Sequence, residues 1–125
     1  MPRKIAYWTS TVLAAVMLLF ALSYLTGSRQ VVEGFNHLGY PQYLRLILGF
    51  AKPLAAIVLL WPGLPLLKEW AYAGVAFAWG MAFVAHLQAG DGGEAFFPLV
   101  LLALLVVSYL TRPPSRRLAL ATAST

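Results

Sequence analysis

The sequence contains no cysteine, and this absence removes a whole group of functions. Without a thiol the chain can form no disulfide, run no CxxC redox chemistry and offer no thiolate nucleophile. Metal sites built on cysteine are excluded as well. Any chemistry must therefore use other side chains.

Charged residues are also scarce. Nine Lys or Arg and four Asp or Glu side chains make up only 10% of the 125 residues, against roughly 25% in an ordinary soluble domain. A soluble fold needs a polar exterior that so few charges cannot supply. Because 61% of the residues are hydrophobic, the composition predicts an integral membrane protein. The net charge of +5 does not indicate a nucleic-acid partner, since the basic residues are scattered or flank apolar segments.

Four apolar segments are long enough to cross a bilayer, whose core of ~30 Å requires about 20 helical residues. We predict transmembrane helices over residues 5–26, 44–61, 70–87 and 95–111. Two prolines and a glycine in residues 61–65 end the second segment, and the glycine-rich turn at residues 90–93 ends the third.

The predicted fold is therefore all-α, a polytopic membrane protein with an antiparallel bundle of four transmembrane helices. We expect this domain to cover residues 1–114, followed by a disordered, basic cytoplasmic tail over residues 115–125. A competing interpretation makes residues 1–23 a cleavable signal peptide, with a basic start and small residues near Ser23. The apolar run continues to a full spanning length, which favours a retained helix.

Basic residues predict the orientation. Six of them fall on the side that holds both termini, namely Arg3, Lys4, Lys68, Arg112, Arg116 and Arg117. Only Arg29 and Arg45 fall on the other side. The positive-inside rule then places both termini in the cytoplasm.

Lys52 is the most informative residue, because it lies inside the second predicted span. An ammonium group at that depth costs several kcal/mol unless it extends to the headgroups, pairs with an anion or loses its proton. It could extend along the helix to the outer headgroups. The alternative, which we favour, is an inward-facing lysine paired with a carboxylate in a polar pocket.

These residues predict a ligand-binding pocket in the outer half of the bundle. Lys52 is its charged anchor, Glu33 or Asp91 the counter-ion, and Arg45 and His86 the rim. The expected ligand is small and lipophilic, a quinone or a lipid. We expect no metal site, because the two histidines lack HxxxH or ExxH spacing, and no catalytic residue can be assigned.

Several strings carry a resemblance to a known family. They are residues 37–41, 48–52, 62–74 and 86–87. In order and spacing they resemble the DoxX-like membrane proteins over about residues 5–111. The resemblance implies a four-helix bundle found mainly in bacteria, hence a protein of the inner membrane, and it includes Glu33, Lys52 and His86 in the family pattern.

The resemblance also implies two further functions. The namesake of the family is a subunit of a thiosulfate:quinone oxidoreductase, so the chain could be an accessory membrane subunit of a quinone-linked enzyme. A distant animal branch assists receptor assembly, so a non-catalytic assembly or chaperone factor is the other alternative. We expect no covalently bound cofactor, a quinone as candidate ligand, and membrane lipid as a partner. A second copy of the chain or another membrane protein is a further candidate partner.

Overall fold

The computed structural model describes residues 2–116, and helices make up nearly all of this part. Four helical stretches are long and apolar enough to cross a membrane. They are α1 with the 3-10 helix η1 (Pro2–Leu19 and Phe20–Thr26), α3 (Gln42–Leu60), α4 (Pro65–Gln88), and η2 with α5 (Gly92–Ala95 and Phe96–Leu110). The prediction of an all-α, multi-pass membrane protein is confirmed.

The helix boundaries differ most from the prediction at α4. This helix begins at Pro65 rather than at residue 70. Proline is well suited to the first helical position, because its φ is already helical. An N–H at that position makes no hydrogen bond within the helix, so proline loses nothing by lacking one. The connection between α3 and α4 is therefore shorter than the sequence predicted.

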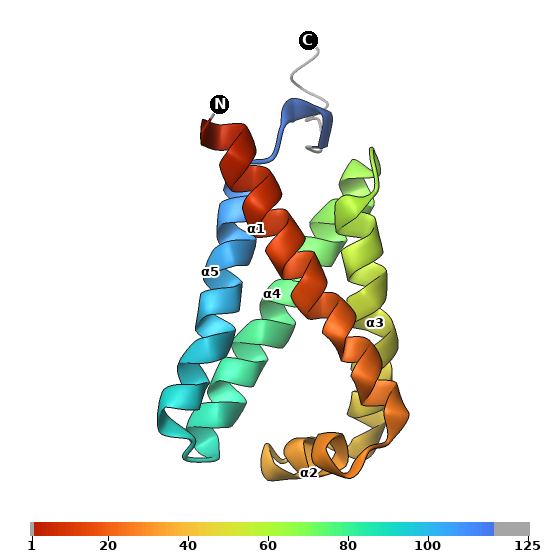
Figure 1. Cartoon of the computed structure of the whole chain (residues 1–125), viewed down its shortest axis with the longest axis vertical. Coiled ribbons are helices and arrows are strands. Elements are labelled where there is room, and N and C mark those ends of the chain that lie inside the picture. The colour runs from red at the N-terminus through yellow and green to blue at the C-terminus, as the bar shows by residue number, and fades with distance from the viewer. Residues whose placement is uncertain (1, 117–125) are drawn as a thin grey trace.

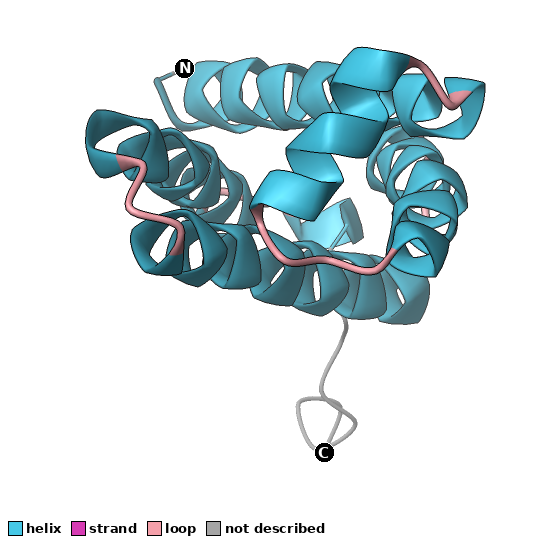
Figure 2. Ribbon diagram, turned by 90° about the horizontal axis from the view of Figure 1, so that it is seen from below, coloured by secondary structure: helices cyan, strands magenta, loops and turns pink. Residues whose placement is uncertain are grey.

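The four long helices form a closed ring, in which each packs against two others (Figure 1). α1 and α4 both contact α3 and α5 and lie diagonally across from each other. Pro2 and Arg116, the first and last described residues, lie at one end of the bundle, here called the terminal end. The short helix α2 (Arg29–His37) lies at the opposite end, here called the α2 end. Seen from below, α2 crosses this end of the bundle (Figure 2).

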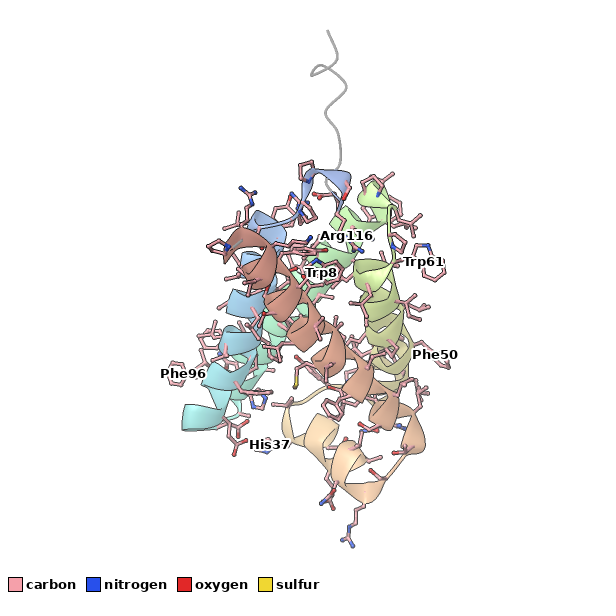
Figure 3. The ribbon with its side chains drawn as sticks, turned by 45° about the horizontal axis from the view of Figure 1, so that its top comes forward. Trp8, His37, Phe50, Trp61, Phe96 and Arg116 are labelled. Atoms are coloured by element: carbon pink, nitrogen blue, oxygen red, sulfur yellow. The ribbon has the colours of Figure 1, made fainter. Side chains whose placement is uncertain are left out.

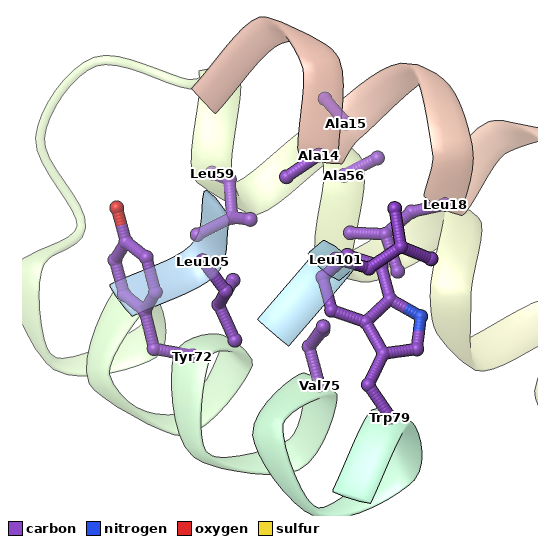
Figure 4. Packing of buried hydrophobic residues seen from close by; sticks show 10 residues of the cluster. All are labelled: Ala14, Ala15, Leu18, Ala56, Leu59, Tyr72, Val75, Trp79, Leu101 and Leu105. Carbon is purple, nitrogen blue, oxygen red and sulfur yellow. The ribbon is translucent and has the colours of Figure 1, made fainter. Parts of the chain in front are cut away.

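The core consists of alanines interleaved with larger side chains (Figure 4). Its ten buried members are Ala14, Ala15, Leu18, Ala56, Leu59, Tyr72, Val75, Trp79, Leu101 and Leu105. Small residues let membrane helices approach closely. Large apolar side chains such as Phe50, Trp61 and Phe96 instead project outward (Figure 3), each more than half exposed. Such an exterior suits contact with lipid.

A buried polar cluster ties three helices together. The Ser108 hydroxyl of α5 lies 2.5 Å from the Thr11 hydroxyl of α1 and 2.6 Å from the Tyr72 hydroxyl of α4. Serine and threonine hydroxyls that bond across helices stabilise membrane bundles by about 0.6 kcal/mol each on average. The cluster fixes the relative rotation of these helices.

Two basic side chains cap the last turn of α3 at the terminal end. The final carbonyls of a helix have no partner within it. Here Lys68 Nζ donates to the Val58 carbonyl at 2.7 Å. Arg116 donates to the carbonyls of Leu59 and Leu60, at 2.9 and 3.2 Å. Positive charge at a helix C-terminus is also favoured by the helix dipole.

This capping corrects two expectations. Lys68 was expected in a loop, yet it lies in the first turn of α4 and is fully buried. Arg116 was expected in a disordered tail, yet it belongs to the 3-10 helix η3 (Pro114–Arg116) and stacks 4.8 Å from the Trp8 ring at the terminal end (Figure 3). The remainder of that tail, residues 117–125, lies outside the described residues.

Candidate functional site

A cavity of about 250 Å³ lies in the half of the bundle nearest α2. Side chains from all four long helical stretches and from α2 line it. The walls are mainly apolar and aromatic, with Phe20, Phe35 and Trp79 among them. Lys52 and His86, two of the predicted site residues, also line it. Two of the predicted site residues therefore lie in the wall of the same cavity.

α2 closes the cavity because the local sequence makes a short amphipathic helix. Ser28 caps its N-terminus by accepting a hydrogen bond from the Val31 N–H. Phe35 is the buried residue of the helix, and its ring packs edge-on against Tyr24 with centroids 4.9 Å apart. The remaining face of α2 is largely exposed. The helix therefore covers the cavity with an aromatic side chain.

Lys52 lies about 15 Å along α3 from its start at Gln42, at ~1.5 Å per residue. Its Nζ is 5.3 Å from the centroid of the Tyr24 ring, within the range of a cation–π contact. It has no ion-pair or hydrogen-bond partner among residues 2–116. Glu33, one of the two predicted counter-ions, does not pair with Lys52. It forms an ion pair with Arg29 at 3.1 Å on the exposed face of α2 instead.

Asp91, the other candidate counter-ion, binds two histidines instead. Its Oδ2 lies 2.5 Å from His86 Nδ1, and its Oδ1 contacts His37 Nε2. Hydrogen bonds from His37 and then from His86 hold the pKa of Asp91 below its usual range. An ionised carboxylate only accepts, so His86 donates through Nδ1 and keeps Nε2 for a ligand. Asp91 thus orients a cavity residue without lining the cavity.

Arg45 does not lie at the cavity. Its Nε donates to the Gln42 side chain at 2.9 Å, and its Nη1 donates to the Tyr24 carbonyl. The guanidinium therefore joins α3 to the end of η1. Of the five predicted site residues, Lys52 and His86 line the cavity, Asp91 supports it, and Glu33 and Arg45 lie outside it.

The sequence comparison agrees with this architecture. The model of the DoxX-like family matches residues 8–108, which span all four membrane helices. The chain belongs to the DoxX-like family. Comparisons with curated proteins and with solved structures find no match. The resemblance drawn from the sequence is thus confirmed, and the function of this DoxX-like protein must be argued from its own side chains.

Tyr40 is a cavity residue that was not predicted from the sequence. Its hydroxyl is buried and has no hydrogen-bond partner among the described residues, and its side chain lines the cavity. Burial, and the nearby Tyr24, raise the pKa of Tyr40. A buried hydroxyl without a partner costs about 1–3 kcal/mol. No sequence signal marks this tyrosine, because its burial depends on how α2 folds back over the bundle.

A groove of about 370 Å³ on the exterior adjoins the cavity. It runs between α3 and α4, where Ala55, Ala71 and Gly74 leave space. The groove and the cavity share Leu48, Lys52 and Ala78. Lys52 of the DoxX-like protein therefore lies where this mainly apolar cavity meets the exterior groove.

Proposed function

We propose that this DoxX-like protein binds an amphipathic, lipid-soluble molecule of the quinone or isoprenoid-lipid type. The polar head occupies the cavity, and the apolar tail leaves through the groove between α3 and α4. The observation that carries the proposal is Lys52, a membrane-embedded lysine at the junction of the two spaces that has no counter-ion among residues 2–116. Ionisable residues inside membranes are costly and commonly mark functional sites.

The dimensions support a divided binding mode. Pockets for drug-sized molecules have roughly 300–1,000 Å³, so the cavity of about 250 Å³ suits a ring-sized head rather than a whole lipid. The adjoining groove of about 370 Å³ receives the first part of a tail. The rest of the tail then lies among the lipids.

The polar groups support a head with oxygen acceptors. The Lys52 ammonium and the Tyr40 hydroxyl are the donors in the cavity wall. A quinone presents two carbonyl oxygens on a flat ring, which these donors can bind. The flat apolar walls, including Trp79, suit the faces of such a ring.

Retained small molecules provide the direct test. The chain is purified in mild detergent, and its extract is analysed by mass spectrometry for Lys52→Met, Tyr40→Phe and the wild type. We expect a near-stoichiometric quinone or isoprenoid lipid in the wild type, its loss in Lys52→Met and a reduced amount in Tyr40→Phe. Lys4→Met is the control, because it removes an exposed lysine at the terminal end.

Two outcomes would refute the proposal. One is equal retention in Lys52→Met and the wild type. The other is no retained molecule in any sample, together with no saturable binding of an added short-tailed quinone analogue. Crosslinking to another membrane protein would then favour the assembly factor, and quinone reduction by membranes would favour the oxidoreductase subunit.

We also propose that the protein lies in the cell membrane with both termini in the cytoplasm, as the six-to-two distribution of basic residues indicates. The lack of native cysteine makes this testable without background labelling. A membrane-impermeant maleimide applied to intact cells should label Gln30→Cys in exposed α2 and leave Ser115→Cys at the terminal end unlabelled. The reverse pattern would overturn the orientation.

A further inference from the structure

The turn between α4 and η2 gathers three potential metal ligands. His86, Asp91 and Glu94 each present a nitrogen or oxygen atom, and these atoms lie within 4.8 Å of one another. Gly90 and Gly92 make this possible, because both adopt positive φ values of 75° and 62°, which glycine tolerates.

The backbone of the turn holds the ligands in place. The Asp91 N–H donates to the His86 carbonyl at 3.0 Å, and the Glu94 N–H donates to the Asp91 carbonyl at 3.4 Å. The aspartate is thereby folded back onto the last turn of α4, and the glutamate lies within η2. The ligands are spaced His-x4-Asp-x2-Glu because a turn, and not one helix face, brings them together. The helical spacings HxxxH and ExxH therefore do not predict this cluster.

His37 adds an independent contact from another element. It reaches from the end of α2 to Oδ1 of Asp91, while His86 faces Oδ2. One carboxylate is thus held on both oxygens, and its side chain is only 9% exposed. Groups that bind the free oxygen of a ligating carboxylate are typical of metal sites, where they fix the ligand's orientation.

We propose that His86 Nδ1, Asp91 and Glu94 bind one divalent cation of the zinc class, with His37 as a positioning residue on Asp91. Imidazole nitrogen and carboxylate oxygen bind zinc at about 2.0–2.2 Å, and the nitrogen disfavours calcium and magnesium. Binding requires His86 Nδ1 and Asp91 Oδ2, which are 2.5 Å apart, to separate slightly. It also requires a Glu94 oxygen to approach, and the exposed Glu94 side chain is free to move. When the ion replaces the hydrogen bond between His86 and Asp91, the imidazole proton moves to Nε2.

The metal site does not depend on the proposed ligand. Glu94, Asp91 and His37 do not line the cavity, so substitutions there probe the ion separately from the quinone or lipid. Lys52→Met should lose the small molecule and bind zinc like the wild type. If zinc binding fails, the proposed binding of a quinone or lipid can still be tested, and the reverse also holds.

Calorimetric titration with zinc chloride tests the site. The full chain is purified in detergent with a tag that contains no histidine, stripped with a chelator and titrated in excess magnesium. We expect one zinc per chain, with affinity weakened about tenfold or more by Glu94→Gln and abolished by Asp91→Asn. Glu33→Gln is the control, because it removes another exposed acid of the α2 end.

The role of His37 has its own readout. His37→Ala should weaken zinc binding about tenfold, whereas His37→Gln should restore much of the affinity because an amide N–H can still donate to Asp91. The proposal is overturned if the wild type shows no saturable zinc binding, or if Glu94→Gln and Asp91→Asn bind zinc as the wild type does. Since Glu94 is exposed, its variant remains informative even if Asp91→Asn does not fold.

Discussion

Replacing Lys68 with methionine should lower the free energy of unfolding by about 2–4 kcal/mol. The buried Nζ donates to the carbonyl oxygens of Val58 and Gly63, each at 2.7 Å, and also to that of Trp61. Methionine has a similar length and no donor. The substitution therefore leaves three carbonyls unpaired where α3 ends.

The magnitude follows from two opposing effects. Hydrogen bonds to a charged group contribute about 1.5–3 kcal/mol each, so three bonds amount to about 4.5–9 kcal/mol. Removing the ammonium also abolishes its desolvation penalty, which is several kcal/mol. The difference gives the predicted 2–4 kcal/mol, and it should appear as a decrease in Tm of about 10 °C.

Thermal unfolding in detergent, followed by tryptophan fluorescence, measures this effect. Lys4→Met makes the same chemical change at an exposed position, and it should shift Tm by no more than about 2 °C, as surface substitutions usually do. If Lys68→Met were as stable as Lys4→Met, the carbonyl contacts would contribute nothing. The capping argument would then be refuted.

Further stability predictions concern packing and the buried hydroxyls. Gly49→Ala would bring a Cβ within 2.6 Å of the Leu25 side chain and should destabilise the bundle by about 1–3 kcal/mol. Gly74→Ala is the matched control, because its added Cβ meets nothing within 4 Å. It should be neutral or slightly stabilising in the same thermal unfolding experiment. Ser108→Ala deprives two hydroxyls of their shared partner and should cost about 1–3 kcal/mol; a melt that matches the wild type would contradict this. Tyr40→Phe removes a hydroxyl that has no partner within residues 2–116, so its Tm without ligand should not fall.

The sequence by itself determined that this is a four-span membrane protein. Too few charges exist to cover a soluble fold, and the spans follow from the length of apolar helix that a bilayer requires. It also marked Lys52 and His86 as candidate site residues, because an ionisable side chain within or beside a span is unusual regardless of how the helices pack.

Only the tertiary structure decided what those side chains contact. Asp91 was a candidate counter-ion for Lys52, yet His37 from α2 and His86 from α4 bind it instead. Lys68 was counted as a topology signal, yet it caps a helix end. These outcomes depend on contacts between residues far apart in the chain, which hydropathy and spacing along one segment do not encode. The apolar exterior can therefore be predicted from the sequence, whereas the partners of the polar side chains are determined by how the helices pack.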